Sequence, residues 1–371
     1  MLGKDTSLNF KVTHVKGRYV TNTHIEPYLN TLGHPFRVEI LGRSVENRPI
    51  YGIYVGHGPK RIFMWSQMHG NESTTTKAVL DLVNFLMQPS QQVDELLSKV
   101  TLHIIPILNP DGATAYTRFN ANEIDLNRDA QNLSQPESRV LRKAFEGFKP
   151  NFCFNLHDQR TIFNVGQTKS PATVSFLAPS FDEARNNSDS RSIAMKIIVA
   201  MNEELQKFIP GQVGRFDDSF NPNCVGDSFQ MKGIPTILFE AGHFTEDYQR
   251  EKTREFIFNA LQKSICTIAN DSIDRYPLEA YFEIPENNKL FVDILIENAH
   301  VLDASLKEKE CISLIYKEIL KNDTIKLIPT VSEKGFEKDT YFGHKILDCT
   351  IEEDINWLKT QKIPQLIKEL D

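Results

Sequence analysis

The chain has 371 residues, of which 40% are hydrophobic and 25% charged, with a formal net charge of -7 and a pI near 5.9. This composition excludes disordered and fibrous proteins, and the acidic balance argues against a general nucleic-acid binder. Five widely spread cysteines without a C-x-x-C pair argue against a disulfide framework and a thiolate zinc site. The sequence as it stands shows no signal peptide and no membrane span, so we expect a cytoplasmic protein.

Short β-forming runs alternate with segments of helical period along the first three quarters of the chain. We expect strands at residues 36–41, 49–55, 61–66, 101–108, 152–157 and 235–240. We expect helices at 72–87, at 134–148 behind a capping box formed by Ser134 and Glu137, at 190–208 and at 245–268. Apolar strands separated by helices predict an α/β/α sandwich with a mixed, mostly parallel central sheet, whose first two strands form an antiparallel edge hairpin.

The composition of the sequence changes after residue 276, where lysine and glutamate become more frequent. A strand-like run covers 290–299, and a terminal helix is expected at 351–370. We therefore predict a catalytic-type domain at 1–276 and a small C-terminal α+β domain at 277–371. Neither the role of the C-terminal domain nor the oligomeric state follows from the sequence.

Ligand-type residues stand at the ends of three expected strands, where ligands gather in α/β sheets. His69 and Glu72 form an H-x-x-E pair just after the third strand, His157 ends the fifth, and Glu240 ends the sixth. A catalytic zinc takes three protein ligands and leaves one position open for water. Gly70 allows the tight turn that would let His69 and Glu72 point toward the same spot.

A bare H-x-x-E pattern is weak evidence, and the chain contains a second one at His243 and Glu246. That second pair does not follow a strand end of its own, so its ordinary interpretation is a helix N-terminus with Thr245 as the cap. Glu240 carries more weight, because a carboxylate at the end of an apolar strand is costly unless something pairs with it. Outside the ligand set, Glu240 has the usual place of a general base.

The segment between the H-x-x-E pair and His157 favours an anionic ligand. It opens with the turn signature N-P-D-G at 109–112 and then carries Arg118, Asn127 and Arg128. A guanidinium binds a carboxylate through two parallel hydrogen bonds, and an asparagine amide can donate beside it. Taken alone, arginines on a solvated loop would be the simpler interpretation.

Together these features resemble the carboxypeptidase A-type zinc metallocarboxypeptidase family, which also includes murein peptide amidases and, more distantly, N-acyl amino acid deacylases. The resemblance covers about residues 35–270. It is carried, in order, by G-x-S-x-x-x-R-P-I at 42–50, H-G-N-E at 69–72, N-P-D-G at 109–112, D-L-N-R at 125–128, and the strand-end His157 and Glu240. One such motif is weak, whereas six in the same order are specific.

The resemblance implies a fold, a cofactor and a reaction. It implies one zinc ion per chain, with His69, Glu72 and His157 as its ligands, and Glu240 as general base and later proton donor. The implied activity is hydrolysis of the C-terminal amide bond of a peptide by zinc-activated water.

The resemblance also implies which residues contact the substrate, a peptide or small amide with a free carboxylate. Arg118 would polarise the scissile carbonyl and stabilise the oxyanion. Asn127 and Arg128 would hold the terminal carboxylate, and Arg48 would line the substrate groove.

The sequence departs from the family pattern in one segment. Digestive members carry a mobile tyrosine about twenty residues before the catalytic glutamate, and residues 214–233 contain none. A phenylalanine of this segment or a residue from elsewhere would fill that space. Asp217, Asp218 and Asp227 in the same segment would either favour a basic substrate side chain or cap turns.

Two alternatives stay open beside peptide hydrolysis. H-G-N-E and D-L-N-R also resemble the deacylases of N-acylated amino acids, although the R-P-I hairpin and the long path from His157 to Glu240 are closer to carboxypeptidases. A zinc-bearing binding protein without turnover is the alternative of another class, and Glu240 argues against it. A serine or cysteine hydrolase is disfavoured, because the chain has no G-x-S-x-G motif.

Overall fold

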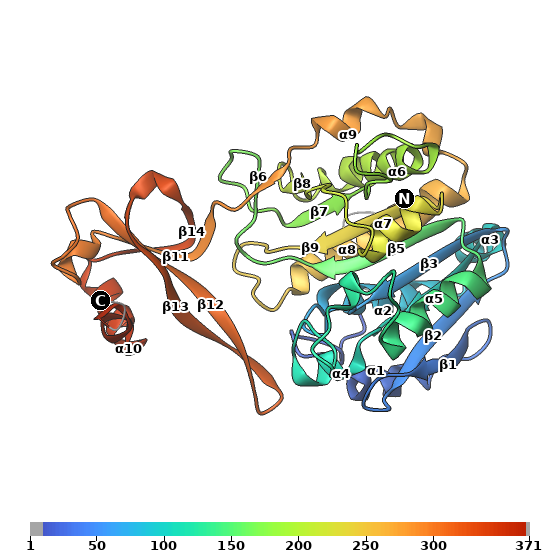
Figure 1. Ribbon diagram of the computed structural model, residues 1–371, viewed down its shortest axis with the longest axis horizontal. Coiled ribbons are helices and arrows are strands. Elements are labelled where there is room, and N and C mark those ends of the chain that lie inside the picture. The colour runs from blue at the N-terminus through green and yellow to red at the C-terminus, as the bar shows by residue number, and fades with distance from the viewer. Residues whose placement is uncertain (1–9, 369–371) are drawn as a thin grey trace. The chain divides into compact units, whose positions relative to one another are not determined.

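A computed structural model describes residues 10–368, and the chain divides into two compact units (Figure 1). The first unit runs to Gln159 and continues through Ala172–Asn287, and the second consists of Arg160–Pro171 and the chain from Asn288 onward. None of the helices within residues 10–368 is long and apolar enough to cross a membrane.

The first unit is an α/β structure whose elements alternate along the chain. Its helices are α1 (Asn22–Leu29), α2 (Thr74–Leu86), α3 (Gln91–Lys99), α4 (Pro110–Ala115), α5 (Pro136–Phe148), α6 (Asp189–Leu205), α7 (Val225–Met231), α8 (Glu251–Ala269) and α9 (Glu279–Glu283). Its strands are β1 (Arg37–Arg43), β2 (Pro49–Gly56), β3 (Lys60–Ser66), β4 (Val100–Ile105), β5 (Phe152–Asp158), β7 (Val174–Leu177), β8 (Val213–Arg215) and β9 (Thr236–Ala241).

These strands form one eight-stranded sheet in the order β1-β2-β4-β3-β5-β9-β7-β8. The centre, β4-β3-β5-β9, is parallel, and β1 and β2 form the expected antiparallel hairpin at one edge. All six expected strands lie in this sheet, so the predicted α/β sandwich is confirmed. The short strands β7 and β8 were not expected, and β7 runs antiparallel to β9.

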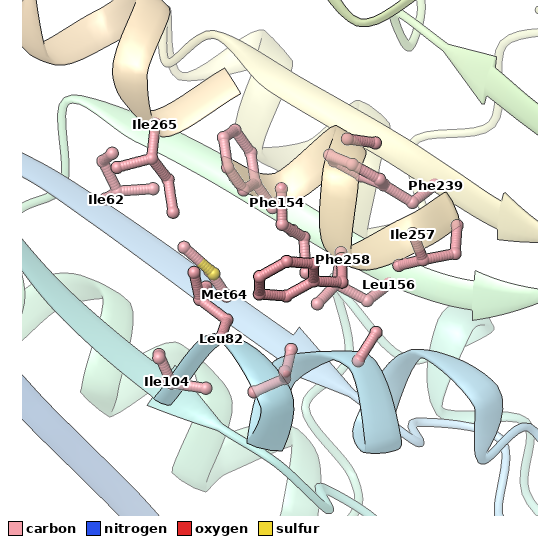
Figure 2. Packing of buried hydrophobic residues seen from close by; sticks show 14 of the residues in the cluster. Ile62, Met64, Leu82, Ile104, Phe154, Leu156, Phe239, Ile257, Phe258 and Ile265 are labelled. Atoms are coloured by element: carbon pink, nitrogen blue, oxygen red, sulfur yellow. The ribbon is translucent and has the colours of Figure 1, made fainter. Parts of the chain in front are cut away.

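The centre of the sheet is buried on both faces, as its continuous apolar strands require. On β3, Ile62 and Met64 pack into the larger core beneath α2 and α8, while Phe63 and Trp65 face the smaller core beneath α5 and α7. Figure 2 shows the larger core, where Ile62 and Met64 lie with side chains from the neighbouring strands and from both helices. Because both faces are covered, polar chemistry is restricted to the strand ends.

Three helices, α2, α5 and α8, begin later than the sequence pattern predicts. The capping box at Ser134 is wrong: α5 begins at Pro136, and the Ser134 hydroxyl instead donates to Asp129 at 2.8 Å. Proline favours the first helical position and forces the preceding Gln135 into extended backbone, which fixes the start. Helix α8 begins at Glu251 rather than residue 245.

The start of α8 is set by an aspartate instead of the predicted cap at Thr245. The Asp247 carboxylate accepts hydrogen bonds from the backbone N–H groups of Glu251, Lys252 and Thr253 at 2.7–3.1 Å. These are amides that the first turn of a helix leaves without an internal partner. Thr245 is exposed and lies two residues before this acceptor.

The second unit contains a four-stranded sheet in the order β13-β12-β11-β14. Its elements are β6 (Asn164–Val165), β10 (Asn287–Asn288), which begins at the last residue of the first unit, β11 (Phe291–Glu297), β12 (Glu310–Lys321), β13 (Thr324–Glu337), β14 (Phe342–Asp348), α10 (Glu352–Thr360) and α11 (Ile363–Lys368). Residues of α10 and α11 pack with β11 and β12 in one hydrophobic cluster. The expected terminal helix is two helices, which are separated at Lys362 by a left-handed φ of 59°. Its predicted end at 369–370 lies outside the described residues.

The division into units differs from the expected boundary between residues 276 and 277. The chain enters the second unit after Asn287, and residues 160–171 belong to that unit as well. Helix α9 explains the shift, because its Tyr281 is buried in the larger core of the first unit. The Tyr281 hydroxyl oxygen also accepts a hydrogen bond from the Ala178 backbone N–H at 3.3 Å.

Candidate active site

The loop after β3 brings His69 and Glu72 together through a tight turn. The Glu72 backbone N–H donates to the His69 carbonyl at 3.1 Å, and α2 begins only at Thr74, so Glu72 precedes the helix rather than opening it. A Cβ at Gly70 would lie 1.9 Å from the carbonyl carbon of Gly112 in α4. Glycine is required at position 70 because two backbones meet there.

His157 and Glu240 lie side by side at the ends of neighbouring parallel strands. His157 of β5 pairs in register with Glu240 of β9. Paired residues of adjacent strands point to the same side of the sheet, so both side chains leave the sheet together. His157 and Glu240, which the sequence places at the ends of two expected strands, are therefore direct neighbours in the fold.

His69, Glu72 and His157 form one buried cluster. The His69 Nδ1 lies 2.8 Å from Glu72 Oε1, the His157 Nδ1 lies 2.8 Å from Glu72 Oε2, and the two Nδ1 atoms are 3.1 Å apart. One ligand-type atom from each residue lies within 4.8 Å of the others, and no other such group occurs among residues 10–368. The cluster comes from two strand ends that are 88 residues apart in the sequence.

The cluster fits a zinc ion by its chemistry and spacing. Two imidazole nitrogens and a carboxylate are a known donor set for catalytic zinc, with bonds of about 2.0–2.2 Å that place tetrahedral ligands roughly 3.3 Å apart. Two Nδ1 atoms that face each other at 3.1 Å need a cation or a shared proton between their lone pairs. The residues present therefore suit a metal that binds through both Nδ1 atoms.

The electrostatics of Glu72 and His157 favour the protonation states that bind metals, whereas at His69 the neighbouring carboxylates of Glu72 and Asp125 outweigh burial and raise the pKa. Burial alone would raise the pKa of Glu72, but the two histidines outweigh it and hold that pKa well below its usual range. Burial lowers the pKa of His157, which keeps this imidazole neutral. An ionised carboxylate and a neutral imidazole are the forms that coordinate a divalent cation.

Glu240 has the environment of a carboxyl group that holds a proton. Its Oε2 is buried and has no hydrogen-bond partner within the described part of the chain. Burial raises the pKa of Glu240 well above its ordinary value, and the negative charges of Glu72 and Asp158 raise it further. A buried carboxyl group with a strongly shifted pKa is a candidate for proton transfer in catalysis.

Asp125 belongs to the site although the sequence did not single it out. Its carboxylate lies 3.1 Å from His69 Nε2 and accepts hydrogen bonds from Arg118 at 3.0 Å. A carboxylate behind a ligating histidine fixes the ring and its tautomer. The signal available was its place in D-L-N-R, but the partner His69 lies 56 residues away.

Arg118 lies at the mouth of the cluster. Asp125 holds its Nε and Nη2, and its Nη1 lies 3.2 Å from His69 Nδ1 and 3.6 Å from Glu72 Oε1. The side chain is 41% exposed, so the guanidinium is reachable from solvent. This position joins the predicted oxyanion-stabilising arginine to the cluster.

Asn127 and Arg128 follow in a short 3₁₀ turn, Leu126–Arg128, beside α7. The Asn127 Oδ1 accepts a hydrogen bond from the Val225 N–H at 2.9 Å, which leaves the amide Nδ2 as its group for a ligand. The exposed Arg128 donates to the Asn127 carbonyl at 2.7 Å and contacts Cys224 Sγ at 3.0 Å. The two residues thus form a cationic, hydrogen-bonding edge on the same loop as Arg118.

Arg48 is engaged elsewhere. Its Nη1 pairs with the buried Asp111 of α4 at 2.6 Å and also with Glu46. Its described hydrogen bonds and ion pairs include no member of the cluster. Unlike Arg118, Arg48 therefore has no hydrogen bond or ion pair with the cluster within the described residues.

The second H-x-x-E pair does not take part in the cluster. His243 does follow a strand end, two residues after β9, and its ring packs against Tyr248 with centroids 4.5 Å apart. Glu246 is exposed and has a left-handed φ of 62°. This pair belongs to a loop before α8.

The three aspartates of 214–233 have different surroundings. Asp218 forms ion pairs with Arg191 at 2.6 Å and Arg185 at 3.0 Å, and Asp217 accepts hydrogen bonds from Ser219. Asp227 is buried in the first turn of α7, and burial raises its pKa to about 7. All three thus have structural partners, since Asp227 also forms hydrogen bonds with Cys224 and with the Ser180 backbone.

Residues 25–218 match the family of zinc carboxypeptidases. Carboxypeptidase 2 of Trichophyton rubrum is 28% identical over 111 residues, which cover 30% of this chain and 20% of that protein. The catalytic chain of human carboxypeptidase N is 27% identical over 184 residues, which cover 36% of this chain and 40% of that protein. The chain therefore spans less than half the length of either relative.

A solved structure resembles the fold of this chain. A crystal structure of a metallo-carboxypeptidase from Burkholderia cenocepacia aligns with a TM-score of 0.53 and 19% identity, over 68% of each chain. The match at 25–218 includes His69, Glu72, Arg118 and His157, and it covers more than half of the chain. This protein belongs to the zinc carboxypeptidase family, and zinc is its cofactor.

Proposed function

We propose that this protein is a zinc metallocarboxypeptidase that removes the C-terminal residue of a peptide. The observation that carries the proposal is the His69–Glu72–His157 cluster with Glu240 in register beside His157. A binding protein would need the metal ligands but no carboxyl group with a raised pKa at that position. The matched region ends at residue 218, so the place of Glu240 is supported by geometry.

In the proposed reaction, Glu240 moves the proton. His69, Glu72 and His157 would hold zinc, which would lower the pKa of a water molecule and polarise a carbonyl. Glu240 accepts a proton from the attacking water and later gives it to the leaving amine. Its place in register beside His157, at the end of the neighbouring strand, supports this role.

Arg118 would stabilise the negative charge that develops on the carbonyl oxygen. The Asp125 carboxylate binds Nε and Nη2 of Arg118, and this contact leaves Nη1 facing the cluster. A donor held in place before the reaction is worth more than a mobile one, since it needs no rearrangement as charge develops. Asp125 in this way serves both Arg118 and His69.

Asn127 and Arg128 would bind the free carboxylate of the substrate. The Asn127 Nδ2 and the exposed Arg128 guanidinium are donors on one turn, and a carboxylate is the acceptor that such a pair suits. This binding would select the end of a chain over its interior. Asp227 is the one aspartate of its segment that has the burial expected of a side-chain pocket, and a basic side chain would keep it ionised.

The test is hydrolysis by the zinc-loaded protein of three substrate groups: peptides with a free C-terminus, the same peptides amidated at the C-terminus, and N-acyl amino acids with murein peptides. We expect cleavage of the free peptides and little of the amidated ones. Cleavage of the N-acyl or murein group alone would establish a deacylase or amidase instead. Zinc binding without any hydrolysis, and with peptide binding unchanged in Glu240→Gln, would favour a binding protein.

A further inference from the structure

We propose that Arg48 and Asp111 are positioning residues that set the metal-ligand loop and Arg118 through helix α4. This inference rests on the proposed function, because it concerns how the same site is built. Neither residue hydrogen bonds to His69, Glu72 or His157 in the described part of the chain, so their effect has to pass through the backbone.

Asp111 is a buried anion that the turn between β1 and β2 satisfies. Its side chain is 1% exposed. It accepts hydrogen bonds from the Ser44 hydroxyl at 2.7 Å, the Glu46 N–H at 2.9 Å and Arg48 Nη1 at 2.6 Å. Removing one partner of a buried ion pair leaves an uncompensated charge, and the structure relieves that cost by moving the charge toward water.

Helix α4, which carries Asp111, lies directly against the metal-ligand loop. The space between Gly70 and Gly112 has no room for a methyl group. On either side of this contact, the Asn71 N–H donates to the Thr117 carbonyl at 3.2 Å, and the Asn109 side chain donates to the Met68 carbonyl at 3.2 Å. A shift of α4 would therefore move the turn that separates His69 from Glu72.

The same helix also sets Arg118. The Thr117 N–H donates to the Gly112 carbonyl at 2.9 Å, and Arg118 is the next residue along the chain. Asp111, Gly112 and Arg118 are thus parts of one short rigid segment. The turn at Ser44–Arg48 holds this segment through Asp111, and the ligand loop contacts the segment at Gly112 and at Thr117, the residue before Arg118.

The test compares two arginines of the same hairpin. Arg48→Met removes the half-buried cation that pairs with the buried Asp111, whereas Arg37→Met removes an exposed ion pair with Glu39 and serves as the control. Zinc affinity of the metal-free protein is measured by chelator competition, together with the melting temperature. Partners behind a metal ligand typically contribute 10–100-fold in affinity, so we expect Arg48→Met to weaken zinc binding by about tenfold and Arg37→Met to leave it unchanged.

Milder variants keep the test valid if Arg48→Met does not fold. Ser44→Ala removes one donor to Asp111 without changing charge, and Arg48→Lys restores a cation. We expect a smaller loss of zinc affinity in the first and recovery of most of it in the second. With a cleavable peptide, kcat should fall and KM should stay, because neither residue touches substrate.

Two results would overturn the positioning role. One is a zinc affinity of Arg48→Met and Ser44→Ala equal to that of Arg37→Met, whatever the melting temperatures. The other is a raised KM with unchanged zinc affinity, which would place Arg48 in the substrate groove. Zinc affinity is measured without substrate, so a failure of the proposed peptidase activity would appear separately, as normal zinc binding without hydrolysis.

Discussion

The two H-x-x-E loops of this protein share a sequence pattern and differ in everything that matters for metal binding. His69 and His243 are both buried, and both follow a strand end of the same sheet. In the first loop, Gly70 allows a close backbone contact, and Glu72 turns back toward His69. In the second loop, the residue after the histidine is Phe244, which packs against Phe256.

The two loops differ at the second residue of the pattern, which is glycine in the first and phenylalanine in the second. An aromatic side chain at that position is drawn into the core, so the next residues turn outward and Glu246 becomes exposed. Glycine makes no such demand. The ligand pair depends on what lies around the pattern more than on the pattern itself.

The largest expected effect separates the two loops directly. His69→Ala and His157→Ala each remove one of three zinc ligands, so we expect loss of bound zinc and of nearly all hydrolysis. His243→Ala serves as the matched control and should keep one zinc per chain. Metal analysis of the purified variants measures the outcome, and a full equivalent of zinc in both ligand variants would show that the cluster is not the metal site.

Glu240→Gln should have the next largest effect, although Glu240 stands only three residues before His243. General bases typically contribute 10²–10⁴-fold in rate, so we expect a loss of that order in kcat with zinc retained. Single-turnover kinetics on the zinc-loaded protein measure it. A rate within threefold of wild type would exclude Glu240 as the proton carrier.

We expect wild type and Glu240→Gln to differ in how the stability of the metal-free protein depends on pH. The raised pKa of Glu240 means that the unfolded chain releases this proton at lower pH than the folded protein does. Unfolding then releases a proton, so the free energy of unfolding of wild type falls as pH rises above the ordinary carboxyl range. Glu240→Gln lacks this loss, and its advantage in melting temperature should be absent near pH 4 and grow toward neutral pH.

Arg118→Ala tests whether the arginine beside the His69–Glu72 loop stabilises the oxyanion. Losing one such donor typically costs about 10²–10³-fold in rate. We expect a fall in kcat within that range and little change in zinc content. Arg37→Ala, on the exposed edge hairpin, is the control and should leave the rate unchanged. An Arg118 variant that differs from wild type only in KM would point to a binding role instead.

We expect the smallest effects from the aspartates that lie beside the two loops, Asp125 beside the first and Asp247 beside the second. Asp125→Asn weakens the carboxylate behind His69, and such changes typically cost 10–100-fold in metal affinity. Asp247→Ala removes the cap of α8 and should cost about 1 kcal/mol of stability with zinc affinity unchanged. Chelator competition and urea unfolding distinguish the two, and equal zinc affinities would contradict the role given to Asp125.

Much of the first unit could be predicted because its information is local. The six expected strands are apolar runs, and a run of this kind indicates a strand even when the neighbouring strands in the sheet are unknown. The strands β7 and β8 have only four and three residues, too few for a pattern to appear. They hold their place through pairing with β9 and with each other.

The site was predictable only as far as the residues carry their own signal. His69, Glu72 and His157 are ligand types at strand ends, and the structure brings them together. Asp125 and Arg48 act through partners that are distant in the sequence. No local pattern announces that Asp125 lies behind His69 or that Arg48 pairs with Asp111.

The pairing of His157 with Glu240 also makes the site a sensor of strand register. A slip of β9 by one residue against β5 would place Phe239 or Ala241 beside His157 and turn the carboxyl group to the opposite face of the sheet. The metal ligands would remain, and the proton carrier would be lost. A misregistered chain would therefore bind zinc and yet be inactive, so turnover per bound zinc reports on the fraction of molecules whose sheet has closed correctly.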